Sequence, residues 1–227
     1  MIQLHDQRID NNRSALGVDS RGHVYALGWL IEESEGRQAW LQLLQQLRQR
    51  GLGNVRLIDG AGSLDLPAAG KAVFPESQFQ ICLWHLCRDL MRQIKGLNWI
   101  QRQHLYYDFW GVFNALTLEE CYERYLTFLR KWNRIHPAIE RLFARYETHL
   151  FYYYDFPQDY NYRLRTVNLA EGFFSHLRVF LRKYPGWTSP HQVYLIMGIF
   201  LKGMNAYREV FNSNLAPLIK DTFIYAY

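Results

Sequence analysis

The sequence of 227 residues has no long apolar run and only three cysteines. The longest apolar run near the C-terminus, Val193–Phe200, has eight residues, too few to span a bilayer. The first residues, MIQLHDQR, contain no apolar signal core, so we expect no secretion. An odd and small number of cysteines argues against a disulfide framework and suits a reducing cytosol. We therefore expect a globular cytoplasmic protein with no membrane partner.

Acidic residues are the minority among the charged residues. The chain has 26 Lys and Arg against 21 Asp and Glu, a formal net charge of +5, which mildly favours a polyanionic partner. Aromatic residues make up 16% of the chain, and Tyr152, Tyr153 and Tyr154 are consecutive. Such rings can stack on nucleic-acid bases, but aromatic helices more often form an ordinary core.

The first ninety residues have the pattern of an α/β fold. The predicted strands are residues 2–6, 14–19, 23–32, 54–59 and 77–82, the second and third joined by a Ser-Arg-Gly turn. The predicted helices are residues 34–49, with Ser34 as cap, residues 67–74, and one that begins at His85. This order matches the ribonuclease H-like fold, a mixed five-stranded sheet with helices on both faces.

The strand signal disappears between about Leu97 and Tyr160. Thr117 and Glu120 have capping-box spacing at the start of a helix to about residue 134, and Pro137 starts another to about residue 150. We predict three parts. Residues 1–96 form the first part of the core, residues 97–160 an all-helical insertion, and residues 161–227 the closing helices of the core, 168–183 and 189–209.

Three acidic residues stand where a metal-dependent site would need them. Asp6 and Asp59 each end a predicted strand, and the ribonuclease H-like sheet places those two strands side by side. Glu171 lies on a later helix. Carboxylates of this kind bind Mg²⁺ or Mn²⁺, and two such ions can activate a water or a 3′-hydroxyl and stabilise the leaving oxygen.

Each acid also has a structural reading. Asp59-Gly60 can be a turn, Asp6 can be a surface residue near a frayed terminus, and Glu171 can cap a helix with Asn168. A capping Glu171 would point its carboxylate at the backbone of Asn168, whereas a metal ligand would point it toward Asp59.

A cysteine and histidine cluster stands in the stretch QICLWHLCRDL. Cys82, His85 and Cys87 could be three of four zinc ligands, but Cys121 stands alone and the chain has no second spaced pair. The deaminase and thioredoxin patterns are also absent. We therefore favour a buried strand end at Cys82, followed by a helix that starts at His85.

Several motifs together resemble the Mutator-type DDE transposases. Asp59-Gly60 is followed by Phe74-Pro75 and by Gln80-x-Cys82-x-x-His85 with Arg88. The stretches LGWLIEESEGRQAWLQLLQQLRQRGL and YYYDFPQDYNYRLRTVNLAEGFFSHLR resemble the flanking family sequences. The resemblance covers roughly residues 15–200. Asp89 stands where the family usually has Asn, and Val167 where it has a second Thr.

The resemblance implies a DNA transposase core that uses Mg²⁺ or Mn²⁺ for strand cleavage and strand transfer. Asp59 and Glu171 would be the second and third catalytic acids, and Cys82 and His85 a pair that flanks the site. The first acid is Asp6 if residues 2–6 form the first strand, and Asp10 is a worse alternative. If the true first strand is missing, the chain is an inactive DNA-binding remnant.

A basic segment follows the tyrosine-rich stretch. Its cations are Arg163, Arg165, Arg178, Arg182 and Lys183, with Glu171 as the one acid between residues 161 and 183. Arg178 and Arg182 share a helical face, which suits DNA phosphates, although a solvated helix face has the same pattern. We expect DNA as partner and a nucleoid-associated location. We also expect no end-recognition domain, and we leave open whether the chain forms a homo-oligomer.

Overall fold

The computed structural model describes residues 12–18, 24–31, 36–60, 65–162, 164–167 and 222–226, and scattered positions between 179 and 205. By its internal contacts the chain divides into two compact units. Unit 1 contains Met1–Phe79 and Val167–Tyr227, and unit 2 contains Gln80–Thr166. None of the described helices is both long and apolar enough to cross a membrane.

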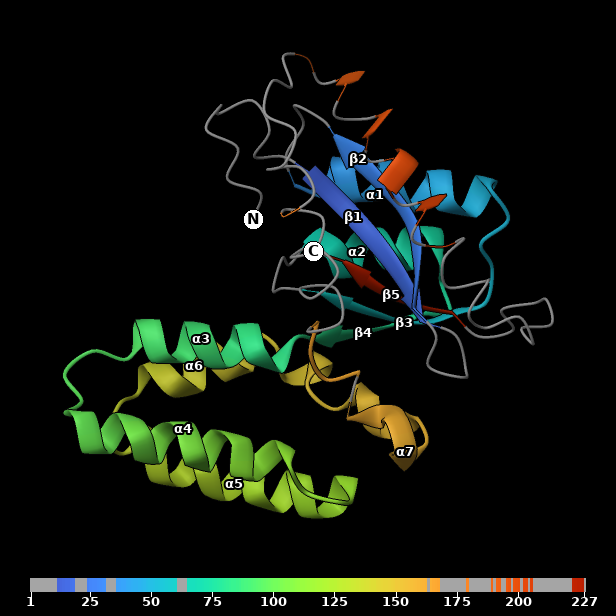
Figure 1. Ribbon diagram of the computed structural model, residues 1–227. Coiled ribbons are helices and arrows are strands. Elements are labelled where there is room, and N and C mark those ends of the chain that lie inside the picture. Colours follow the sequence, from blue (N-terminus) through green and yellow to red (C-terminus); the bar gives the residue numbers. More distant parts are fainter. Residues whose placement is uncertain are drawn as a thin grey trace. The chain divides into compact units, whose positions relative to one another are not determined.

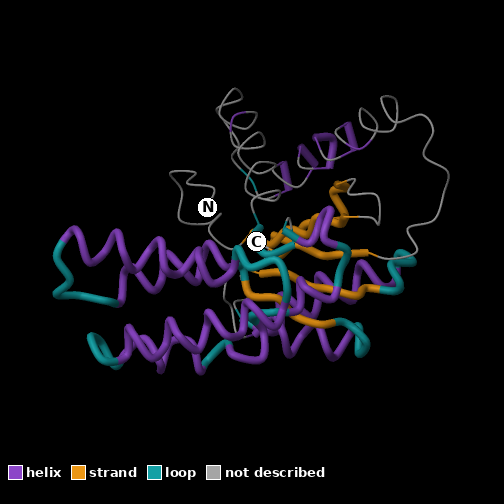
Figure 2. The backbone as a smooth tube through the Cα atoms, turned by 90° about the horizontal axis from the view of Figure 1, so that it is seen from below, coloured by secondary structure: helices purple, strands orange, loops and turns teal. Residues whose placement is uncertain are grey.

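Five strands form one sheet of mixed direction (Figures 1 and 2). They are β1 (Asn12–Val18), β2 (Val24–Ile31), β3 (Val55–Gly60), β4 (Gln78–Ile81) and β5 (Thr222–Ala226), in the order β2-β1-β5-β3-β4. β1 is antiparallel to both β2 and β5, and β3 is parallel to β5. The expected mixed α/β class is confirmed.

The strand in the middle of the sheet is one that the sequence analysis did not predict. The four predicted strands between residues 14 and 82 correspond to β1 to β4, each within a few residues. The predicted strand at residues 2–6 lies outside the described residues. The central position belongs to β5, from the other end of the sequence.

Two helices pack against one another and against strands of unit 1 (Figure 1). α1 (Arg37–Gln49) buries the apolar face predicted for it, with Ala39, Trp40, Leu43, Leu44 and Leu47. Its N-cap is Gly36, whose φ of 75° suits glycine, while the predicted cap Ser34 lies outside the described residues. α2 (Asp65–Val73) starts two residues before the predicted helix and buries Leu66, Ala69 and Val73.

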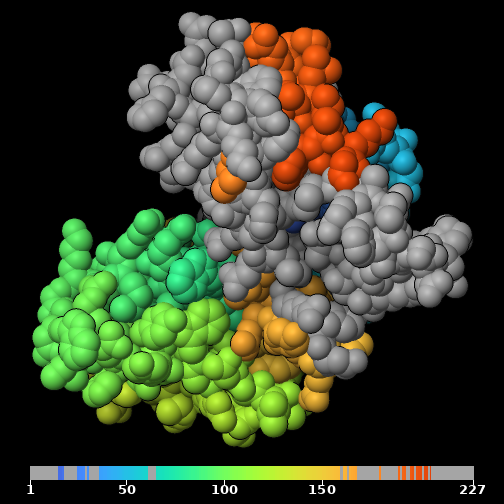
Figure 3. All heavy atoms as spheres, in the orientation of Figure 1, coloured from blue at the N-terminus to red at the C-terminus, as the bar shows by residue number. Residues whose placement is uncertain are grey.

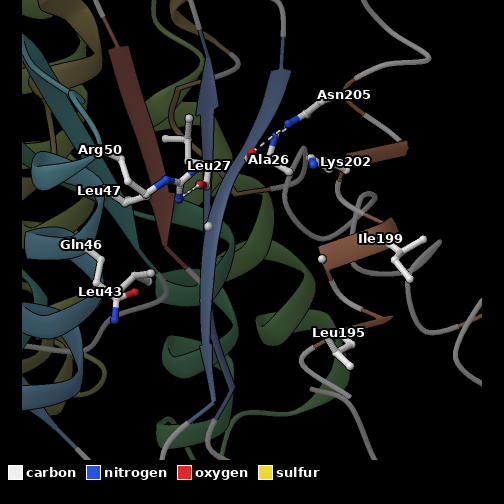
Figure 4. Close-up of a pocket in the computed structure, with 12 residues that line it drawn as sticks. Ala26, Leu27, Leu43, Gln46, Leu47, Arg50, Leu195, Ile199, Lys202 and Asn205 are labelled. Atoms are coloured by element: carbon white, nitrogen blue, oxygen red, sulfur yellow. Dashed lines mark hydrogen bonds between the residues drawn. The ribbon is translucent and has the colours of Figure 1, made fainter. Parts of the chain in front are cut away.

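Side chains bond to the backbone of the edge strand β2. The side-chain amide of Asn205 accepts a hydrogen bond from the Ala26 N–H and donates one to the Ala26 carbonyl, both at 3.0 Å. Arg50 donates to the carbonyl of Leu27 at 2.6 Å (Figure 4). Bonds of this kind satisfy an edge that could otherwise pair with another chain. The adjoining cavity of about 520 Å³ has Arg50 and Lys202 in its lining and no acid.

Unit 2 contains helices and the end of β4. The helices are α3 (Leu83–Gln93), α4 (Trp99–Phe113), α5 (Leu118–Asn133), α6 (Ala138–Ala144), the 3-10 turns η1 (Glu147–His149) and η2 (Tyr152–Asp155), and α7 (Gln158–Asn161). α4 and α5 lie side by side (Figure 1) and bury aromatic rings against one another and α6, with Phe109 and Phe128 both in contact with Phe143. Thr117 caps α5 through the backbone N–H of Glu120, as predicted.

The tyrosines at 153 and 154 contribute to the structure of unit 2. The hydroxyl of Tyr153, a buried residue, donates to the carbonyl of Phe113 at 3.2 Å, and that of Tyr154 donates to Ala115 at 2.8 Å. These bonds support the core interpretation of these rings over base stacking. The short helix α7 follows these tyrosines.

Candidate functional site

Asp59 is a buried acid at the carboxyl end of β3. Its side chain is 2% exposed, and neither carboxylate oxygen accepts a hydrogen bond within the described structure. Burial raises the pKa of Asp59 well above its ordinary value of 3.8, and the nearby backbone amide of Gly60 opposes this only in part. A buried carboxylate without a partner is costly, which is the usual mark of a functional group rather than of a structural one.

Gly60 has a packing reason to follow Asp59. It is the last residue of β3 and not part of a turn, so the turn interpretation of Asp59-Gly60 is wrong. A Cβ atom at Gly60 would lie 2.5 Å from Leu66 Cδ2 and 3.3 Å from Phe79 Cε2. Glycine therefore allows α2 to pack close to the strand end that carries Asp59.

The residue beside Asp59 on the central strand is a tyrosine. In the parallel pair of β3 and β5, the Cα of Asp59 is the register partner of that of Tyr225, and Gly60 pairs with Ala226. The strand sequence TFIYA contains no acid. The position in register with Asp59 on β5 therefore has no carboxylate.

Cys82 and His85 form the corner between β4 and α3. Cys82, fully buried, is the N-cap residue of α3, and His85 is 3% exposed in the first turn. The helix begins at Leu83, two residues before its predicted start. Burial, together with the charge of Arg88, lowers the pKa of His85 to about 4, so its imidazole is neutral at pH 7.

The zinc alternative finds no support at this corner. Cys82, His85, Cys87 and Cys121 all belong to the described residues, and no three His, Cys, Asp or Glu side chains among those residues form a group that could hold a metal. Burial raises the pKa of Cys87 to about 12 and also raises that of Cys121, which keeps both as thiols.

Gln80 is a structural residue whose role the sequence analysis missed. Its buried side-chain amide donates to the carbonyls of Ile81 and Leu150, at 2.9 and 3.1 Å, and accepts from the N–H of Tyr153 at 3.2 Å. It thus joins the end of β4 to the segment before η2. A glutamine between the apolar strand residues Phe79 and Ile81 is the signal that could have revealed it.

Replacement of Gln80 by Leu should destabilise the protein by roughly 2–4 kcal/mol, because the Leu150 carbonyl and the Tyr153 N–H would stay buried without partners. Urea unfolding followed by tryptophan fluorescence measures the change. Gln93→Leu, at an exposed position of α3, is the control and should change stability by less than about 0.5 kcal/mol. Equal stability of both variants would mean that the Gln80 bonds contribute nothing.

Arg165 connects the segment before Glu171 to the start of α3. Its backbone carbonyl accepts the hydrogen bond of the Leu83 N–H at 2.9 Å, which satisfies one of the free donors at that helix end. Its guanidinium donates to the Phe113 carbonyl at 2.6 Å and lies 5.9 Å from the centre of the Trp110 ring. These bonds give Arg165 a structural role, and its predicted DNA contact stays a prediction.

The other predicted site residues lie outside the described residues. They are the two acids Asp6 and Glu171 and the cations Arg163, Arg178, Arg182 and Lys183. Of the predicted site residues that the structure describes, Asp59 lies at the end of β3, Cys82 directly follows β4, and His85 lies in the first turn of α3.

Comparison with known proteins relates this chain to the transposases of insertion sequences. The family model described as "Transposase, Mutator family" matches residues 8–191, so the chain belongs to the Mutator family of transposases.

Three curated relatives illustrate the degree of similarity. The transposase for insertion sequence element IS1201 of Lactobacillus helveticus is 23% identical over 70% of this chain and 42% of its own length. The ISRM3 transposase of Rhizobium meliloti is 26% identical over 82% of this chain and 47% of its own length. The IS406 transposase of Burkholderia multivorans is 29% identical over 72% of this chain and 42% of its own length. The chain thus matches less than half the length of each of these relatives.

Proposed function

We propose that this chain is part of the catalytic core of a DDE-type transposase, which cleaves and joins DNA strands by metal-dependent phosphoryl transfer. The observation that carries the proposal is Asp59, a buried carboxylate at a strand end whose two oxygens accept no hydrogen bond within the described structure. The end of a strand is also the position that the sequence analysis predicted for the second catalytic acid.

The strand order supports a ribonuclease H-like core. That fold needs an antiparallel pair, β2 and β1, followed by a central strand that is antiparallel to β1 and parallel to the strand that carries the second acid. The described sheet has these directions around its central strand. The helices α1 and α2 contact this sheet from the connections predicted for such a fold.

The carboxylate of Asp59 fits a divalent cation. Mg²⁺ and Mn²⁺ prefer carboxylate oxygens, and a bound cation would favour the ionised form that burial disfavours. Asp6 and Glu171 are the other proposed ligands. When bound, the metal ions would activate the attacking oxygen and stabilise the leaving oxygen.

The proposed third acid follows a segment anchored next to β4. The bond between the Arg165 carbonyl and the Leu83 N–H fixes that segment at the start of α3, one residue after Cys82. Glu171 is six residues further along the sequence. This short connection supports a role for Glu171 near the strand ends.

The strand proposed to carry the first acid would compete with β5 for the central position in the sheet. A strand at residues 2–6 that placed Asp6 beside Asp59 would need the central position that β5 takes in this structure. The same chain can hold only one of the two segments there. Asp59 is the one proposed catalytic acid among the described residues, and Asp6 and Glu171 lie outside them.

DNA is the proposed substrate, and the nucleoid the proposed location. The basic residues between Arg163 and Lys183 are the proposed phosphate contacts, and a homo-oligomer stays a prediction. No described observation bears on the target sequence.

Nicking of supercoiled plasmid DNA tests the proposal. The chain should convert plasmid to the nicked form in Mg²⁺ or Mn²⁺ but not in EDTA, and Asp59→Ala should abolish nicking. The control is Asp65→Ala, an exposed acid at the start of α2, which should nick as the wild type does.

Two outcomes contradict the proposal. Unchanged nicking by Asp59→Ala would remove Asp59 from the chemistry. Absence of nicking by every variant, with DNA binding intact, would instead support a DNA-binding core that does not cleave.

A further inference from the structure

The solvent face of α3 has an aromatic residue followed by a row of cations. Trp84, Arg88 and Arg92 are spaced by four residues, so they lie along one face of the helix, and Lys95 follows two residues after the helix ends. We call these four residues the α3 stripe. All four are exposed, and the residues of α3 (green) reach the surface of unit 2 in Figure 3.

The stripe is not needed to hold α3 in place. The opposite face of the helix provides the packing, with Leu83, Leu86, Cys87 and Leu90 all buried. Trp84 remains 40% exposed, although a residue of that size would gain most from burial. An exposed tryptophan beside cations is therefore a candidate binding surface for a ligand.

The charges of the stripe are largely uncompensated within α3. Asp89 is the one acid between residues 83 and 95, against three cations. Its ion pair with Arg88 is long, at 3.8 Å, and both side chains are more than a third exposed, so the pair contributes little. The neutral His85 behind Arg88 adds no further charge to this face. The stripe consequently presents net positive charge to solvent.

The dimensions of the stripe suit a nucleic-acid strand. With a rise of about 1.5 Å per residue, Arg88 and Arg92 are about 6 Å apart along the helix axis, and Lys95 follows beyond the helix end, so the three cations can contact successive phosphates. Trp84 lies at the end nearest Cys82, where the strand β4 ends. Proteins bind single strands with cations that contact the phosphate backbone and with aromatic rings that stack on the bases.

We propose that the α3 stripe binds a single DNA strand, with the phosphates on Arg88, Arg92 and Lys95 and an unpaired base stacked on Trp84. The inference rests on the proposed function for the choice of DNA as ligand. It adds a surface outside the basic segment at residues 161–183. Within unit 2, the stacked base would lie at the N-terminal end of α3 and the phosphates toward its C-terminal end.

Fluorescence anisotropy with a labelled single-stranded 20-mer, in EDTA, tests the stripe without any requirement for metal. The variant in which Arg88, Arg92 and Lys95 are all changed to Gln should bind at least tenfold more weakly, with a salt slope lower by about 2. Trp84→Ala should weaken binding by roughly fivefold or more, with the salt slope unchanged.

Matched controls separate the stripe from general charge. Arg134, Arg141 and Arg145 are exposed cations elsewhere on unit 2, and changing all three to Gln removes the same net charge. Trp99, 73% exposed at the start of α4, is the control for Trp84. Both controls should bind as the wild type does. Equal losses in stripe and control variants would overturn the proposal, as would a duplex that binds as well as the single strand with no effect of Trp84→Ala.

The result also separates this inference from the proposed function. Loss of strand binding by the stripe variants, with no Asp59-dependent nicking, would support the stripe and reject the chemistry. Asp59-dependent nicking with unchanged binding by the stripe variants would support the proposed chemistry and reject the stripe.

Discussion

The Asp59→Asn variant is expected to be more stable than the wild type in EDTA at pH 7, by roughly 1–3 kcal/mol. The reason is that the folded protein must either ionise a buried carboxylate, which accepts no hydrogen bond from the side chains of the described residues, or keep it protonated above its ordinary pKa. Asparagine is nearly the same size and carries no charge. Thermal unfolding measures the change, and each kcal/mol should raise Tm by roughly 2–4 °C.

The gain should depend on pH in a direction set by the raised pKa. In the unfolded chain Asp59 loses its proton near 3.8, whereas the folded protein holds that proton to higher pH. Between those values the folded state binds more protons, so the stability of the wild type falls as pH rises. The stability that the protonated carboxyl retains is fully present below pH 3.8. At such pH values the difference in stability between wild type and Asp59→Asn should shrink.

Asp65→Asn, at an exposed acid of the same unit, is the control and should change stability by less than about 0.5 kcal/mol at any of these pH values. An Asp59→Asn protein that unfolds at a lower temperature than the wild type in EDTA at pH 7 would mean that the carboxylate has a stabilising partner. The functional interpretation of its burial would then fail.

Several elements around the site could be predicted because their sequence patterns are local. The hairpin of β1 and β2, the face of α1 that carries Trp40, and the strand that ends at Asp59 all follow from periodicity and turn residues. The burial of Asp59 could not be derived from the pattern alone. It depends on which residues pack over the strand end, which is a tertiary effect.

The central strand could not be predicted, because its place in the sheet depends on partners remote in sequence. Residues 222–226 form a short run with Phe223, Ile224 and Tyr225, and a run of this length fits a strand or a buried helix end equally well. Only the pairing with β1 and β3 distinguishes the two. Aromatic and β-branched residues without alternation are, however, typical of a strand covered on both faces.

A Tyr225→Asp variant should acquire a metal site that the described arrangement lacks. Residues in register on parallel neighbours share a face of the sheet, so position 225 places a carboxylate next to Asp59. Without metal, two adjacent carboxylates repel, and the variant should unfold at a lower temperature than the wild type in EDTA. With Mn²⁺ at 100 times its Kd, the variant should regain about 2.7 kcal/mol.

Isothermal titration calorimetry with Mn²⁺ should show binding to Tyr225→Asp at least tenfold tighter than to the wild type. Ala226→Asp is the register control. It pairs with Gly60, and adjacent residues of a strand face opposite sides of the sheet, so it should not bind Mn²⁺ more tightly than the wild type. Adding Asp59→Asn to Tyr225→Asp should abolish the gain. Equal Mn²⁺ affinity of the 225 and 226 variants would contradict the register, and with it the place of β5 beside the strand that carries Asp59. A gain confined to position 225 would support that register, because only there does the new carboxylate share the face of Asp59.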